Sequence, residues 1–124
     1  MACSHCRMLT SRMSACSYFR LYRRVVHLDD FQGLMKDTYG LRDSERGLAA
    51  TVAWLAEEFG ELAQAVRKGT REEQLHELGD VLAWIASLAA QLDLSLEEAV
   101  DRFKEGCPRC VSSPCSCPDA SMRS

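Results

Sequence analysis

Proline is absent from the middle of this 124-residue sequence, and all three prolines lie close to its C-terminal end, at Pro108, Pro114 and Pro118. Cysteine is missing between Cys16 and Cys107. Proline interrupts helices because it lacks an N–H donor and clashes with the preceding turn. The proline-free stretch from about residue 28 to 104, rich in Leu, Ala and Glu, can therefore form long helices.

Long apolar runs are absent too, and this argues against a membrane-spanning protein. No stretch approaches 18 apolar residues, so we expect no membrane partner. The first 26 residues hold five Arg and no acid, and they lack the apolar run of a secretory signal peptide. We expect a flexible basic tail, or an upstream start that translates non-functional sequence, with an organellar transit peptide as the alternative, and a cytoplasmic protein.

The charge is unevenly distributed, which bears on partners. After residue 26 the chain has ten Lys and Arg against 18 Asp and Glu, a local charge of −8 within a total of −3. Nucleic-acid backbones are bound by clustered basic residues. An acidic folded part therefore argues against a nucleic-acid partner.

Four helices are predicted from apolar periodicity and end signals, at about residues 29–39, 45–69, 70–92 and 95–103. Gly40 is expected to end the first. Thr70 and Ser95 are each followed three residues later by Glu, which predicts two capping boxes. Short connections favour an all-α antiparallel bundle over residues 27–105, preceded by the tail at 1–26 and followed by a Cys-rich loop at 106–124.

Two acidic motifs lie on the second and third predicted helices. They read Glu58-Phe-Gly-Glu61 and Glu77-Leu-Gly-Asp80. Residues three apart on a helix are surface neighbours, so each motif presents two carboxylates that can share a cation. With 100° per residue, Glu58 and Glu77 fall inside the apolar arc of their helices, while Glu61 falls at its edge and Asp80 just outside it.

A third pair with the same spacing, Glu98 and Asp101, lies opposite the apolar residues of its helix and is predicted to be a solvated face. Carboxylates facing an apolar arc are costly unless they are paired or metal-bound. Gly60 and Gly79, which cost about 1 kcal/mol each in a helix interior, suggest a close approach of the two helices. His76 points about 100° away from Glu77 and is predicted to be a surface residue, not a ligand.

Four oxygen donors without His or Cys suit a hard cation, Mg²⁺ or Mn²⁺. The two motifs, the fifteen residues between them, and the later Leu96-Glu-Glu-Ala-Val with Lys104 resemble the MazG-like branch of all-α nucleoside triphosphate pyrophosphohydrolases. The resemblance covers roughly residues 28–104. It implies a homodimer or homotetramer that binds Mg²⁺ through Glu58, Glu61, Glu77 and Asp80.

The resemblance further implies hydrolysis of a nucleoside triphosphate between the α- and β-phosphorus, to a monophosphate and pyrophosphate, with Lys104 contacting phosphate. Glu61 or Glu77 is the candidate base for the attacking water. Trp54 and Trp84 each lie four residues from a motif acid. They are predicted either to stack on a nucleobase or to pack within the bundle or between subunits. Apolar residues surround more than half of the second and third helices, which also predicts an oligomer.

The last four cysteines, Cys107, Cys110, Cys115 and Cys117, form two closely spaced pairs. Such a loop can wrap one tetrahedral Zn²⁺; free or redox-active thiols are the alternative, and stable disulfides are disfavoured without a secretory signal. An ordered zinc loop would hold the end of the fourth helix near Lys104. A rival hypothesis is a non-catalytic dimeric adaptor that binds a partner through this tail and does not need its acidic residues.

Overall fold

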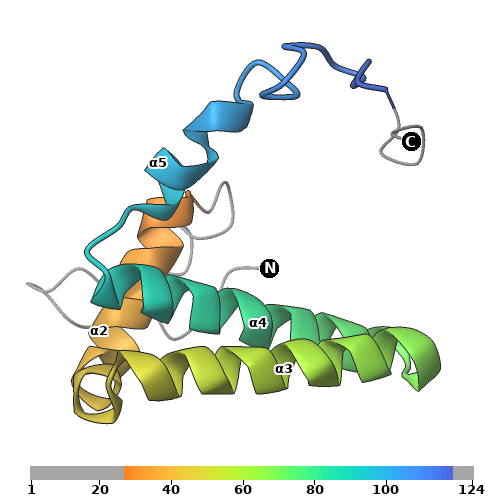
Figure 1. The fold of residues 1–124 in the computed structure, drawn as a ribbon. Coiled ribbons are helices and arrows are strands. Elements are labelled where there is room, and N and C mark those ends of the chain that lie inside the picture. Colours follow the sequence, from red (N-terminus) through yellow and green to blue (C-terminus); the bar gives the residue numbers. More distant parts are fainter. Residues whose placement is uncertain (1–26, 119–124) are drawn as a thin grey trace, which may run out of the picture.

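Helices make up all the regular secondary structure of the residues that the computed structural model describes, 27–118 (Figure 1). They are, in order, α2 (Leu28–Arg46), α3 (Leu48–Lys68), α4 (Arg71–Gln91), α5 (Leu96–Val100) and a 3₁₀ helix, η1 (Asp101–Phe103). The predicted all-α fold is confirmed. The tail predicted at 1–26 lies outside the described residues. Among the described helices, none has the length and apolar character needed to cross a membrane.

Helices α3 and α4 form an antiparallel pair that packs along most of its length (Figure 1). The tight connection depends on Gly69, where an added Cβ would lie 2.8 Å from the Ala65 carbonyl oxygen. Helix α4 then begins with the predicted capping box. The Thr70 hydroxyl accepts from the Glu73 amide at 3.2 Å, and the Thr70 amide donates to the Glu73 carboxylate at 2.6 Å.

The predicted end of the first helix is wrong. Helix α2 continues through Gly40 to Arg46, and the break comes at Gly47, whose φ of 80° is unfavourable for residues with a side chain. Helix α3 accordingly starts at Leu48, not directly after Ser44. Packing of α2 against α4 outweighs the weak helix propensity of a single interior glycine.

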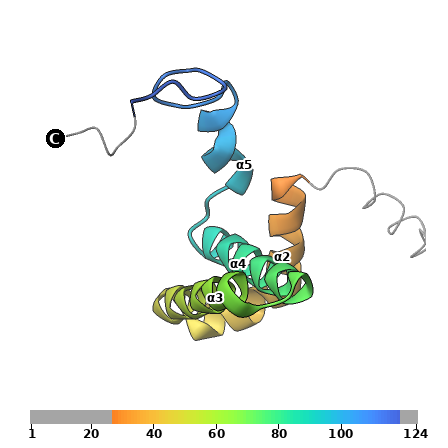
Figure 2. The same cartoon turned by 90° about the vertical axis from the view of Figure 1, so that its right-hand side faces the viewer.

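Helix α5 is held by α2, which crosses the α3–α4 pair steeply (Figures 1 and 2). The Ser95 hydroxyl accepts from the Glu98 amide at 3.0 Å, as predicted for an N-cap. The same hydroxyl donates to Asp29 at 2.8 Å, and Gln32 accepts from the Leu96 amide at 2.8 Å. The predicted capping box is thus only half formed, since no bond from the Ser95 amide to Glu98 is present among the described residues, and the Asp29 and Gln32 side chains of α2 accept from other amides of the first turn.

The core is thin. The buried apolar residues within the described part are all small: Ala65, Val81, Ala86 and Ala89. Large apolar side chains on α3 and α4 stay more than two-fifths exposed, namely Leu48, Val52, Trp54, Phe59, Val66, Leu75, Leu78 and Leu82. A single copy therefore leaves much of its apolar surface in water.

Neither motif glycine marks a close approach between helices. An added Cβ at Gly60 or at Gly79 would meet no atom within 4 Å, so this expectation is wrong for the contacts within one chain. Both glycines lie on the exposed side of their helices. Other residues make the contacts between α3 and α4. Near the start of α3 and the end of α4, for example, Gln91 donates to the buried Thr51 hydroxyl at 2.8 Å.

Candidate functional site

Three carboxylates from the two acidic motifs meet between α3 and α4. One oxygen each from Glu58, Glu77 and Asp80 lies within 4.8 Å of the others. All three side chains are half-buried, so the inward placement that the helical periodicity predicted for Glu58 and Glu77 is confirmed. The arrangement brings together negative charges that no neighbouring Lys or Arg in the described structure pairs with directly.

Glu61 lies one turn further along α3, is exposed, and falls outside this group of three. It lines a separate shallow hollow with Lys68 and Glu77. Glu77 therefore belongs to the group of three carboxylates and also lines this hollow. The structure gathers three of the four predicted ligands and leaves the fourth beside them.

In the acidic group, which we define as Glu58, Glu77 and Asp80, burial and neighbouring negative charges disfavour the ionised form of Glu58. Partial burial raises the pKa of Glu58; a hydrogen bond from Trp84 acts in the opposite direction, and the charges of Asp80, Glu61 and Glu77 raise it further. The Glu77 Oε2 atom is buried and has no hydrogen-bond partner among the described residues. A buried acceptor without a partner costs about 1–3 kcal/mol. The donor chemistry and the orphaned oxygen both fit a hard divalent cation.

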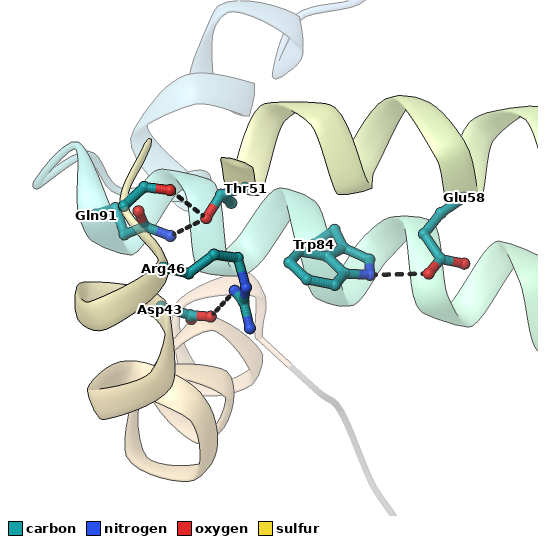
Figure 3. Close-up of polar contacts among 7 residues, drawn as sticks. Asp43, Arg46, Thr51, Glu58, Trp84 and Gln91 are labelled. Atoms are coloured by element: carbon teal, nitrogen blue, oxygen red, sulfur yellow. Dashed lines mark hydrogen bonds and ion pairs between the residues drawn. The ribbon is translucent and has the colours of Figure 1, made fainter. Parts of the chain in front are cut away.

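Trp84 of α4 ties this group to the rest of the bundle (Figure 3). Its indole N–H donates to Oε1 of Glu58 at 3.2 Å. Its ring is stacked with that of Trp54, with centroids 6.1 Å apart and planes 8° from parallel. Both indoles are thus in contact with protein side chains, as the packing interpretation expects. Stacking on a nucleobase stays a prediction.

A chain of contacts continues from Trp84 to α2 (Figure 3). The Arg46 guanidinium lies 4.7 Å from the Trp84 ring centroid, a cation–π distance. Arg46 also pairs with Asp43 at 2.6 Å, and Asp43 is only 3% exposed. The series Asp43, Arg46, Trp84 and Glu58 therefore connects α2, α4 and α3 through side chains.

A hollow of about 290 Å³ opens beside the acidic group, between α2 and the α3–α4 pair. Its walls are Tyr39, Arg42, Asp43, Arg46, Glu58, Asp80, Ala83, Trp84 and Ser87. Sequence reasoning missed Tyr39, Arg42 and Arg46, because the first helix was expected to end at residue 39. The spacing of the two arginines, four residues apart, was the signal that could have placed them on one helix face.

The remaining predicted residues lie at the periphery. Lys104 Nζ is 3.0 Å from Asp101, both side chains are exposed, and Lys104 does not line the hollow beside the acids. His76 is exposed, as predicted, although its Nε2 approaches Asp80 at 3.3 Å. Glu98 and Asp101 are exposed, which confirms the solvated face. The thiols of Cys107, Cys110, Cys115 and Cys117 gather within 4.8 Å of one another.

Comparison with known proteins shows which family this chain resembles. A family model described as the MazG nucleotide pyrophosphohydrolase domain matches residues 46–109, just over half of the chain. Two Bacillus subtilis (strain 168) proteins are similar, both described as uncharacterized. YpjD is 44% identical over 63 residues, covering 43% of this chain and 57% of YpjD. YvdC is 35% identical over 97 residues, covering 64% of this chain and 92% of YvdC. The chain thus spans little more than half of YpjD and nearly all of YvdC.

Proposed function

Because the chain belongs to the MazG nucleotide pyrophosphohydrolase family, we propose that it hydrolyses a nucleoside triphosphate to the monophosphate and pyrophosphate. The observation that supports this most is the half-buried group formed by Glu58, Glu77 and Asp80, beside a hollow bordered by Arg42 and Arg46. Carboxylates and guanidinium groups next to one another suit a ligand made of phosphates and a divalent cation.

Glu58, Glu77 and Asp80 would hold the cation, and Glu61, one turn away, is the fourth proposed ligand. Their oxygens favour Mg²⁺ or Mn²⁺ over softer metals. When bound, such an ion polarises the phosphoryl group and lowers the pKa of a coordinated water. The buried Glu77 Oε2, which has no hydrogen-bond partner among the described residues, is the atom that gains most from it.

The other roles fall to side chains around the hollow. Arg42 and Arg46 offset the negative charge of the triphosphate, and the Trp84 N–H fixes the Glu58 carboxylate. Glu61 or Glu77 accepts a proton from the attacking water as the water oxygen bonds to the α-phosphorus and the bond from the α-phosphorus to the α–β bridging oxygen breaks, that oxygen leaving with pyrophosphate. Lys104, paired with Asp101 in this chain, is a further proposed phosphate contact.

We further propose that a second copy of the chain covers the exposed apolar face of α3 and α4. Val52, Phe59 and Val66 are spaced by seven residues along α3 and are 49%, 63% and 65% exposed. Such spacing places them along one side of the helix. Since the buried core of one copy consists of small side chains, a symmetric partner supplies the apolar burial that a domain of this size needs.

Product analysis tests the proposed activity. The full chain is incubated with canonical and modified nucleoside triphosphates, with and without Mg²⁺, in water enriched in ¹⁸O. We expect pyrophosphate release that requires the metal, with the label in the monophosphate because the α-phosphorus is attacked. Release of orthophosphate, or label in pyrophosphate, would contradict the proposed bond cleavage. No turnover of any nucleotide with Mg²⁺ or Mn²⁺ would favour the non-catalytic adaptor.

A further inference from the structure

The segment after η1 adopts a defined loop although it has no apolar core. It lies at the end of the molecule where α5 and η1 lead away from the α3–α4 pair (Figures 1 and 2). Apart from cysteine and proline, Val111 is the one apolar residue in residues 107–118, and it is 65% exposed. Hydrophobic burial therefore cannot be what holds this loop together.

The sulfur atoms occupy the centre of the loop instead. The Sγ atoms of Cys107 and Cys117 are 3.7 Å apart, and those of Cys110 and Cys115 are 3.8 Å apart. A disulfide bond is about 2.05 Å long, so these pairs are not bonded. Four thiolates around Zn²⁺ at about 2.3 Å form a tetrahedron whose edges are about 3.8 Å. Both sulfur pairs match that edge.

The backbone is arranged so that the thiols converge. The Val111 amide donates to the Cys107 carbonyl at 2.7 Å, and the Cys107 amide donates to the Ser112 carbonyl at 3.1 Å. These two bonds close a tight turn over residues 107–112, which contains Cys107 and Cys110. Gly106, with φ of 101°, enters this turn at a place where an added Cβ would lie 2.7 Å from the Ser112 carbonyl oxygen. The turn therefore requires glycine.

Two backbone amides point at sulfur. The Ser116 amide donates to the Cys110 Sγ, and the Cys117 amide donates to the Cys115 Sγ, both at 3.4 Å. The thiolate is the form of cysteine that binds metal, and backbone N–H groups are suitable donors to it. The Cys110 and Cys115 sulfur atoms thus each accept a hydrogen bond from the backbone of their own loop, as metal ligands commonly do from surrounding groups.

We propose that Cys107, Cys110, Cys115 and Cys117 bind one structural Zn²⁺ that serves as the core of this loop. Four protein thiolates fill a tetrahedral shell and leave no open position, so the ion has no role in catalysis. Binding releases the remaining thiol protons and stabilises the loop by the free energy of metal binding. Mg²⁺ does not replace it, because a hard cation disfavours sulfur ligands. The site is independent of the acidic group and of the proposed activity.

Metal analysis of the full chain tests the site. The protein is produced in zinc-supplemented medium, purified without chelators and measured by mass spectrometry of its metals. We expect one zinc per chain, and less than a tenth of that in Cys110→Ser/Cys115→Ser, with unchanged helical circular dichroism. Co²⁺ added to the zinc-free protein should give the absorption of a tetrahedral tetrathiolate site.

Matched variants locate the ion. Arg109→Ala, an exposed position inside the same loop, should keep full zinc, as should the triple replacement of Cys3, Cys6 and Cys16 by Ser. Glu77→Gln should lose nucleotide hydrolysis and keep zinc, which separates this site from the proposed function. Zinc retained in the Cys110/Cys115 variant, iron in place of zinc, a protein without bound metal, or two disulfides in the purified chain would each overturn the proposal.

Discussion

The indole N–H of Trp84 on α4 donates to the carboxylate of Glu58 on α3, one member of the acidic group, at 3.2 Å (Figure 3). This bond fixes one carboxylate oxygen and leaves the other free for a cation. It also links the acidic group to Arg46, which lies over the same indole ring. The orientation of a proposed metal ligand thus depends on a residue outside the motifs.

Loss of the indole donor should weaken metal binding. In Trp84→Phe the ring is retained and the N–H is lost, so the Mg²⁺ concentration for half-maximal hydrolysis should rise roughly ten-fold or more, as for other outer-shell partners of metal ligands. A titration of activity with Mg²⁺ measures this. Trp54→Phe, which changes the stacked ring without a bond to Glu58, is the control, and equal effects of the two variants would contradict the assignment.

Neutralising the acidic group should abolish hydrolysis without unfolding the protein. Glu58→Gln, Glu77→Gln and Asp80→Asn each remove a charge from a cluster that is repulsive without a cation, so helicity by circular dichroism should be retained. Glu57→Gln, an exposed acid beside Glu58, should remain active. Near-normal turnover in two of the three variants would refute the metal-site assignment and favour the adaptor.

The pair formed by Asp43 and Arg46 should matter for stability. Arg46→Met leaves the buried Asp43 carboxylate without its partner and should lower the free energy of unfolding by about 2 kcal/mol. In the double variant Asp43→Leu/Arg46→Met part of this loss should be recovered, as urea denaturation can show. Strictly additive losses would mean that the two side chains do not interact.

Arg42 should contribute to substrate binding and not to the stability of the fold. It lines the hollow and is exposed, so Arg42→Ala should leave the melting temperature unchanged. Loss of one charge-assisted contact with phosphate should raise KM by roughly ten-fold with little change in kcat. Steady-state kinetics on the preferred nucleotide decide this; an unchanged KM would remove Arg42 from the binding site.

The apolar face of α3 should mediate self-association. We expect a dimer or larger assembly by light scattering at micromolar concentration, and Val66→Glu should dissociate it because a carboxylate would be buried in the interface. Leu41→Glu, at an 86% exposed position on α2, should leave the assembly intact. A folded monomeric wild-type protein would contradict the interface.

Some features of this protein followed from the sequence because they depend on residues close to one another along the chain. The Thr70–Glu73 capping box joins residues three apart, and the burial of Glu58 and Glu77 follows from the period of their own helices. The clustering of the four C-terminal thiols belongs here too, since its members lie within eleven residues of one another.

Other features were decided by contacts between residues far apart along the chain. Helix α2 passes Gly40 because it packs on α4, and only that extension carries Arg42 and Arg46 to the hollow beside Asp80. Asp29 reaches Ser95 across 66 positions, which no local pattern indicates. Local hydrogen-bond rules state where a helix can start or end, whereas the burial gained between helices decides where it does.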